Sequence, residues 1–339
     1  MLSENRKKYF FLLLILTLLV SIVIAGSLGS ARISFGSIVK IITHPLTVNI
    51  EGVKETSRTI VWKIRLPRII LTVLVGMGLG VSGAVFQGIF RNPMANPYIL
   101  GVSSGAAFGV TLGMVMGLQV SFLGMGAIPL SAFIGAIGAS IVVFLISGGG
   151  REILPLLLSG IAMGFFLSAL MSLLMYFNRS QLENIVYWTM GSFNAANWQK
   201  VFIIAPVIFA GSIFLIIFSR DLNLMVMGED SAKSLGLSVK KSRLIFLLVS
   251  TFITASAVSV SGVIGFVGLI VPHAIRIITG PDHRTLIPYS MVGGAILLLV
   301  SDTLARTIIA PTEIPVGIVT SLLGAPFFLF LLNRMRNPK

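Results

Sequence analysis

The residue types that carry most enzyme and metal chemistry are few in this sequence and widely separated. There is no cysteine, and the three histidines, His44, His273 and His283, stand too far apart along the chain to predict a metal cluster. No G-x-x-x-x-G-K-[ST] phosphate loop and no H-E-x-x-H motif occur. We therefore expect no catalytic residue, no metal site and no bound cofactor, and we expect that this chain does not hydrolyse ATP itself.

One short motif resembles a catalytic nucleophile. The residues from Gly101 to Gly105, GVSSG, fit G-x-S-x-G, the nucleophile elbow of hydrolases. That elbow needs a strand before the serine, whereas this motif follows a proline-containing loop and opens an apolar segment. We interpret the motif as a helix start. In the alternative reading, an intramembrane hydrolase, Ser103 or Ser104 would be essential.

Carboxylates could drive transport directly if one of them were buried in the membrane. The eleven Asp and Glu residues lie almost entirely between the apolar segments. Asp302 is the one candidate well inside such a segment, and Arg306 would be its neighbour one helical turn later. An ion-coupled carrier usually buries an ionisable group near mid-membrane. Here, by contrast, we expect Asp302 to pair with Arg306 near the outer helix end. The energy for uphill transport must then come from other chains, with an ion-coupled secondary transporter as the alternative.

The composition requires that these residues be positioned by membrane helices. The sequence is 55% hydrophobic and 11% charged, with a mean hydropathy of +1.00, whereas soluble domains carry about 25% charged residues. Long apolar runs of roughly 20 residues can each cross a bilayer as a helix. We predict an all-α polytopic protein, one transmembrane domain over residues 1–339 with about ten helices. The expected spans are Tyr9–Ser27, Leu66–Ile89, Tyr98–Gly117, Pro129–Ile146, Leu154–Tyr176, Val201–Phe218, Leu244–Val260, Val263–Thr279, Leu286–Arg306 and Ile314–Leu332.

The distribution of lysine and arginine predicts the orientation. Placing both termini in the cytoplasm assigns 15 basic residues to the inside and 10 to the outside. Seven of the ten outer ones lie between Arg32 and Arg68, opposed only by Glu51 and Glu55. Either this loop is long enough to weaken the rule, or it is a docking face for an acidic partner; both readings stay open from the residues alone.

The first apolar run could also be a signal peptide, cleaved near Ala25. It follows Arg6, Lys7 and Lys8, as such a peptide would. Its apolar stretch is long for that role, and Val23-Ile24-Ala25 departs from the A-x-A pattern. We therefore treat the run as the first membrane helix.

Glycine spacing predicts close helix packing. Glycines recur every fourth residue from Gly101 to Gly117, and the pairs Gly76–Gly80 and Gly160–Gly164 repeat the spacing. A side-chain-free stripe lets another helix approach closely. We expect these stripes to be contact faces rather than ligand sites.

The longest polar break in the helical array, residues 219–243, predicts a short cytoplasmic helix. Gly228, Glu229 and Asp230 suit a helix start, with the acids at the positive end of the helix dipole. Ala232, Leu235 and Leu237 would form a small apolar face, and Gly236 a stop. Such a helix can fill a groove in a partner protein; the alternative is a helix that lies on the lipid surface.

Several long motifs resemble one known family. They are RLPR (65–68), GAVFQGIFRNPMANPYILGVSSGA (83–106), YWTMGSF (187–193), MGEDSAKSLGL (227–237), GVIGFVGLIVPHAIR (262–276), GPDHRTLIP (280–288) and EIPVGIVTSLLGAPFFLFLL (313–332). In this order they are similar to the iron-chelate and cobalamin (FecCD-type) ABC-transporter permeases, from Arg65 to the C-terminus. The segment before Arg65 matches only in pattern.

The resemblance implies the membrane subunit of a type II ABC importer in a prokaryotic cytoplasmic membrane. The implied partners are a second copy of the chain, two cytoplasmic ATP-binding subunits and an extracytoplasmic substrate-binding protein. By motif, the residues implied to dock the binding protein are Arg65, Arg68 and Arg306. Those implied for the coupling helix that contacts the ATPases are Gly228, Glu229, Asp230, Ala232, Leu235 and Gly236.

The resemblance also narrows the substrate to metal chelates. In the cobalamin branch, the loop between the fourth and fifth spans supplies small hydroxylated residues to an inner gate, and the corresponding segment Ser147–Pro155, SGGGREILP, lacks that run. We therefore expect an iron(III)-siderophore, with haem and cobalamin as alternatives and a molybdate-type oxyanion as a more distant one.

Overall fold

The computed structural model describes residues 3–29, 33–43, 53–120, 126–150 and 152–336, and in this part of the chain every regular element is a helix. Seven helices are long and apolar enough to cross a membrane: α1 (Glu4–Ser27), the continuous Glu55–Ile89 segment that includes α4 (Leu66–Ile89), α6 (Ala127–Ile146), α7 (Ile153–Phe177), α9 (Trp198–Ile217), α12 (Val239–Ser261) and α14 (His283–Ala305). The all-α polytopic fold predicted from the sequence is confirmed.

Three shorter apolar helices occupy the remaining expected spans. They are α5 (Val102–Val115), α13 (Val267–Thr279) and the Val316–Phe330 part of α15 (Val316–Arg336). α5 begins late because η2 (Pro97–Leu100) precedes it, and α13 begins late because residues 262–266 are not helical. Helices α5 and α13 fall short of the length expected for a full crossing, so the count of ten spans stays a prediction.

Short helices lie between the long ones. They are α2 (Phe35–Thr43), α3 (Glu55–Thr59), the π-helical η1 (Ile60–Arg65), η3 (Arg179–Gln181), α8 (Leu182–Thr189), α10 (Ser219–Met227) and α11 (Glu229–Ser234). Of these, the sequence predicted only α11. Ile33, Ile38 and Ile41 around α2 share a small apolar core with Val61 of η1, which explains how this outer segment folds against the bundle.

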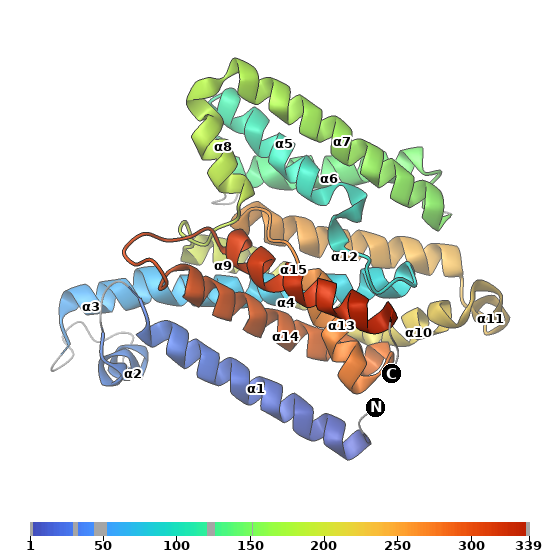
Figure 1. Ribbon diagram of the computed structural model, residues 1–339, viewed down its shortest axis with the longest axis horizontal. Helices are drawn as coiled ribbons and strands as arrows, with labels where there is room; N and C mark the ends of the chain where they lie inside the picture. The colour runs from blue at the N-terminus through green and yellow to red at the C-terminus, as the bar shows by residue number, and fades with distance from the viewer. Residues whose placement is uncertain (1–2, 30–32, 44–52, 121–125, 151, 337–339) are drawn as a thin grey trace.

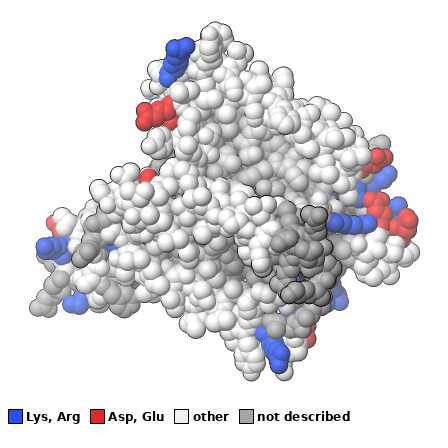
Figure 2. Space-filling model, in the orientation of Figure 1, with Lys and Arg blue, Asp and Glu red and all other residues white. Residues whose placement is uncertain are grey.

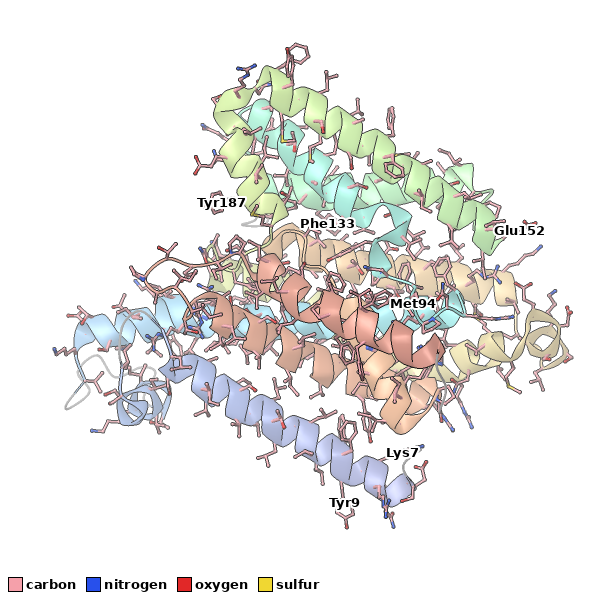
Figure 3. All side chains as sticks on the ribbon, viewed as in Figure 1. Lys7, Tyr9, Met94, Phe133, Glu152 and Tyr187 are labelled. Atoms are coloured by element: carbon pink, nitrogen blue, oxygen red, sulfur yellow. The ribbon has the colours of Figure 1, made fainter. Side chains whose placement is uncertain are left out.

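The helices form two layers, and α4 is the central helix of the larger layer (Figure 1). Helix α4 runs through the main layer, where 83% of its most apolar window is buried among α9, α12, α13 and α14. Helices α5, α6, α7 and α8 form the second layer, and α1 lies along α14 on the opposite side. Figure 3 shows Phe133 of α6 at the boundary between the layers, where it meets the ring of Phe252 of α12 edge-on at 5.3 Å.

Glycines set the closest contacts, as their spacing predicted. A Cβ at Gly80 would overlap the carbonyl oxygen of Ser290, and one at Gly76 that of Gly294, so α4 and α14 touch backbone to backbone. Gly105 and Gly109 of α5 contact α6 in the same way, against Gly135 and Ser131. At the ends of that stripe, Gly101 instead caps the start of α5 at φ 75°, which a residue with a side chain rarely adopts, and Gly117 contacts nothing.

The start of α5 also decides between the two readings of the G-x-S-x-G motif. Here η2 precedes the motif and α5 follows it, so the strand that a nucleophile elbow requires is replaced by a helical turn. The hydroxyl of Ser104 donates a hydrogen bond to the carbonyl of Gly101, 3.1 Å away, within the helix start. The helix-start interpretation is therefore confirmed.

In the view of Figure 2, charged side chains gather at two ends of the molecule, and the surface between them is mostly uncharged. One end carries α3 and α8; the other carries α10, α11 and the first turn of α1. This pattern is typical of a membrane protein with two water-exposed ends and a lipid-facing surface between them. Both ends of the described chain thus lie on the same side as the predicted coupling helix.

Helix α1 belongs to this bundle. The rings of Phe11 and Tyr289 of α14 pack in a tilted arrangement with centroids 4.8 Å apart, and the Tyr289 hydroxyl donates to the carbonyl of Lys7 at 2.8 Å. Ala25, near which signal-peptide cleavage was considered, is fully buried. These contacts fit a membrane helix better than a removable leader.

A valine at Gly80 tests the α4–α14 contact. The added side chain would collide with the backbone of α14, a cost of about 3 kcal/mol or more, so we expect a clearly lower thermal unfolding midpoint in detergent. Gly138→Val on α6 is the matched control, because a Cβ at Gly138 meets nothing within 4 Å. Equal midpoints for the two variants would contradict the contact.

Candidate functional site

The three arginines implied in docking converge on one hollow at the α3 end of the molecule. Arg65 ends η1, Arg68 lies in the first turn of α4, and Arg306 directly follows α14. All three line a cavity of about 230 Å³ together with Glu313. Their exposed fractions are only 5%, 8% and 6%, so they lie inside the hollow rather than on an open surface.

Arg68 is held by two carboxylates. Its Nη2 donates to Asp302 Oδ1 at 2.8 Å, its Nε donates to both oxygens of Asp302 at 3.1 and 3.2 Å, and its Nη1 donates to Glu313 Oε2 at 2.9 Å. The expected pair of Asp302 with Arg306 is present, but at 3.7 Å it is the looser of the two. Asp302 therefore binds mainly to Arg68 of α4, and its ion pair with Arg306, at the end of its own helix, is the weaker contact.

Arg65 and Arg306 cap the end of α1. Arg65 Nη1 donates to the carbonyl of Gly26 at 2.7 Å, and Arg306 donates to the carbonyls of Ala25 and Leu28 at 2.5 and 3.1 Å. The last carbonyls of a helix have no partner within it, and a cation there also stabilises the negative end of the dipole. The sequence reasoning missed this role, since nothing in the spacing indicated which carbonyls would lie nearby.

The opposite end carries the predicted coupling helix. Gly228, with φ 131°, separates α10 from α11, and Glu229 begins α11, as predicted. Glu229 forms an ion pair with Arg243 at the start of α12, and this hydrogen bond lowers the pKa of the Glu229 carboxyl. Asp230 is fully exposed, and its nearest cation is Lys233 at 3.5 Å. The two neighbouring acids thus face different surroundings.

The prediction that Ala232, Leu235 and Leu237 form one apolar face for a partner is wrong, because these residues do not point the same way. Ala232 is completely buried against its own chain, and Leu237 packs on the core, whereas Leu235 is 64% exposed. The helix begins at Glu229, and this register turns Ala232 inward and leaves Leu235, which follows the helix's last residue, outward. Gly236, with φ 85°, ends the segment as expected.

Two further contacts tie α10 to the bundle. Arg91, which follows α4, donates to the carbonyl of Met225 at 2.6 Å. Asn223 donates to Asp282 at 2.7 Å and accepts from the backbone N–H of His283 at 2.9 Å, which joins α10 to the first residue of α14. Hydrogen bonds from Arg284 lower the pKa of Asp282 to about 2, so this connection is ionised at neutral pH.

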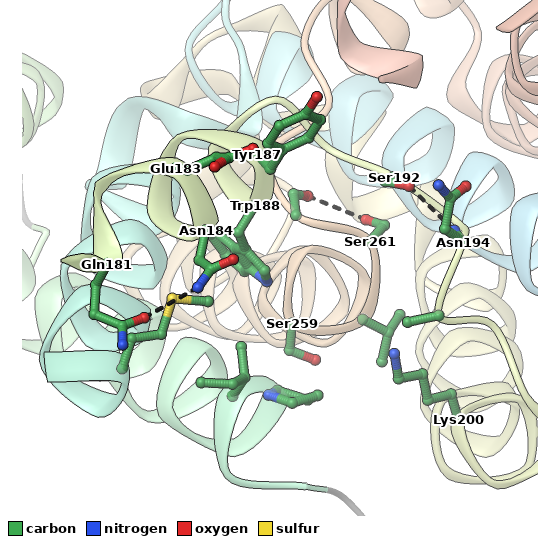
Figure 4. Close-up of a pocket in the computed structure, with 16 residues that line it drawn as sticks. Gln181, Glu183, Asn184, Tyr187, Trp188, Ser192, Asn194, Lys200, Ser259 and Ser261 are labelled. Atoms are coloured by element: carbon green, nitrogen blue, oxygen red, sulfur yellow. Dashed lines mark hydrogen bonds between the residues drawn. The ribbon is translucent and has the colours of Figure 1, made fainter. Parts of the chain in front are cut away.

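Two larger hollows adjoin α8. One, of about 550 Å³, has a mixed lining whose polar residues include Gln181, Glu183, Asn184, Asn194, Lys200, Ser259 and Ser261 (Figure 4). The other, of about 520 Å³, is uncharged and lies between the end of α8 and α15; it is lined by Thr189, Met190, Val263, Gly265, Gly317, Ile318, Ser321 and Leu322. Neither hollow was predicted, since each is formed by segments distant in sequence.

No donor set for a metal ion stands out. In the described residues no three His, Asp or Glu side chains gather closely enough to hold one. His283 contacts Asn223 rather than another histidine, 2.8 Å from ring nitrogen to amide oxygen.

Comparison with known proteins identifies the chain's relatives. The sequence pattern of the FecCD transport family matches residues 14–334. The chain belongs to the FecCD transport family. It is 45% identical to the cobalamin import system permease protein BtuC of Halobacterium salinarum over 284 residues, 83% of this chain and 75% of that one. It is 40% identical to the hemin transport system permease protein HmuU of Yersinia pestis, over 82% of this chain and 85% of that one.

A solved structure agrees with this membership of the FecCD family. An inward-facing metal-chelate type ABC transporter matches with a TM-score of 0.85 and 35% identity, over 96% of this chain and 99% of that one. The resemblance noted from the motifs is therefore confirmed, and the chain is a multi-pass transport permease. The docking and coupling roles of individual residues stay predictions.

Asp302→Asn tests the buried charge cluster. It would leave Arg68 and Arg306 buried beside a neutral group, so we expect a loss of about 3–5 kcal/mol of stability, seen as a lower unfolding midpoint in detergent. Removing both charges, as Arg68→Met with Asp302→Leu, should be less harmful than Asp302→Asn. Glu183→Gln removes an exposed acid and serves as the control; an Asp302→Asn protein as stable as this control would contradict the cluster's role.

Proposed function

We propose that this chain is the membrane subunit of a binding-protein-dependent ABC importer for a metal chelate. Two copies would form the pathway, two cytoplasmic ATPase subunits would contact α10 and α11, and a soluble binding protein would dock at the arginine end. In this orientation both termini face the cytoplasm of a prokaryotic cell. The proposal rests on one observation: this chain belongs to the FecCD family and has two polar ends of different kinds. One end holds the arginine hollow, and the other holds α10 and α11.

The contacts of α10 and α11 supply a route for coupling. Arg243 links α11 to α12, and Arg91 links the end of α10 to α4. Helices α4 and α12 are the most deeply buried of the long spans, with 83% and 72% of their apolar windows inside the protein. A push on α11 by an ATPase subunit would therefore reach the centre of the bundle rather than its periphery.

The uncharged hollow between α8 and α15 is suited to the transport pathway. It is lined by small and apolar residues with two hydroxyls, so it offers a chelate few groups that could hold it. Exposed apolar residues on α15, such as Leu322 at 70%, leave a face that a second copy would cover. Weak binding favours release once ATP-driven rearrangement opens the inner side.

The first substrate to test is an iron(III)-siderophore, with haem and cobalamin beside it. The motifs led to the iron chelate, while relatives named for cobalamin and hemin support the two alternatives. The chemistry common to all three is a large metal complex carried by a binding protein. The complex that the co-purified binding protein retains identifies the substrate.

Uptake into proteoliposomes tests the importer and its coupling. With the ATPase subunits and binding protein present, accumulation of the chelate should require ATP. Replacing both Glu229 and Asp230 by lysine should lower transport per ATP about fivefold or more, because the ion pair to α12 becomes a repulsion. The two single variants show how much of the lost transport per ATP is due to each acid. We expect Glu229→Lys to account for most of the loss.

The charge swap, Glu229→Arg with Arg243→Glu, is the control for that experiment and should restore transport. Uptake by the chain alone under an ion gradient, or normal coupling in the double lysine variant, would overturn the proposal.

Arg65→Gln tests docking at the arginine hollow. We expect affinity for the binding protein to fall about tenfold, and the parent complex to weaken with salt. Lys63→Gln removes the same charge from an exposed position on η1 and is the matched control. Affinity is measured on the intact complex in nanodiscs, with the thermal midpoint to verify folding. Equal affinities of the two variants would argue against the hollow as the docking site.

A further inference from the structure

Among the described residues that line the arginine hollow, Glu313 is the carboxylate that solvent reaches. Its side chain is 31% exposed, compared with 1% for Asp302, and both bind Arg68. It precedes α15 by three positions, in the segment that connects α14 to α15. The two acids therefore differ in kind, because Asp302 is a permanent internal partner and Glu313 lies at the mouth.

Each of the three arginines already donates hydrogen bonds within the protein. Arg68 gives its Nε and Nη2 to Asp302, and Glu313 takes Nη1. Arg65 and Arg306 donate to the carbonyls at the end of α1. Arg68 still has one N–H on each of Nη1 and Nη2 without an acceptor among the described residues, so a carboxylate from outside would share Nη1 with Glu313 and would bind with both oxygens more readily if Glu313 left.

We propose that Glu313 is an internal competitor for the docking carboxylate of the binding protein. This rests on the docking role proposed above. While Glu313 occupies Arg68 Nη1, it competes with the partner's acid for that group, and the apparent affinity falls in proportion to the fraction of time that Glu313 is displaced. Asp302 stays in place during the exchange, so the arginine never loses its buried counter-charge.

The exchange would act on the transport pathway as well as on affinity. The segment after Glu313 is tied to the end of α8: Val316 N–H donates to the carbonyl of Gly191 at 3.0 Å, and Gly317 N–H donates to that of Met190 at 3.1 Å. Met190 and Gly317 both line the uncharged hollow. Displacing Glu313 therefore loosens the outer anchor of the very segment that borders this hollow.

Glu313→Gln and Glu313→Asp test the competition. Gln removes the charge, and Asp keeps it but is one methylene too short to reach Arg68 in the same way. We expect both to bind the cognate binding protein roughly tenfold more tightly, mainly through faster association, in the complete complex with its ATPase subunits in nanodiscs. Glu55→Gln and Glu55→Asp, at an exposed acid on α3, are the matched controls for charge and for length.

Each outcome has one meaning. Tighter docking for both Glu313 variants but not for the Glu55 variants supports the competition. Unchanged or weaker docking of the Glu313 variants, with Arg65→Gln still impaired relative to Lys63→Gln, overturns it and leaves the docking site intact. If Arg65→Gln also matches Lys63→Gln, the docking proposal itself has failed.

Discussion

The contact between α4 and α14 involves no side chains at its closest points, since the helices meet through Gly76, Gly80 and Gly294. In a membrane, where lipid competes equally for apolar side chains, such close packing is a main source of helix association. It also fixes what lies above it. Arg68 begins one of these helices and Asp302 ends the other, so the backbone contact brings both charges to the same level.

Arg68 and Asp302 then tie α4 to α14 at the α3 end of the bundle. Burying an arginine near a membrane is costly unless a carboxylate and hydrogen bonds compensate it, and Arg68 receives both. The same cluster then closes α1, because Arg65 and Arg306 satisfy carbonyls that the helix leaves open. One network of hydrogen bonds and ion pairs thus joins the ends of α1, α4 and α14.

The fold class, the order of the spans and the glycine contact faces could be read from the sequence, because composition and spacing are local properties. The start of α11 at Glu229 was predictable for the same reason. The pairing of Arg68 with Asp302, 234 residues later, was not, since many arginines and acids were possible partners. The different surroundings of Ala232 and Leu235 were missed because α11 ends at Ser234, so Leu235 lies beyond the last helical residue and does not share the face of Ala232.

The separation between Arg68 and Asp302 has a consequence for biosynthesis. As the chain emerges from the ribosome, α4 enters the membrane long before its counter-ion has been translated. The carbonyl of Ala25 at the end of α1 waits longer still, because its donor Arg306 lies 281 residues later. Until α14 arrives, Arg68 must remain at the water interface, which its position in the first turn of α4 permits. The charge network at the α3 end of the bundle is therefore completed last, so a nascent chain that stops before α14 lacks the carboxylate that compensates Arg68.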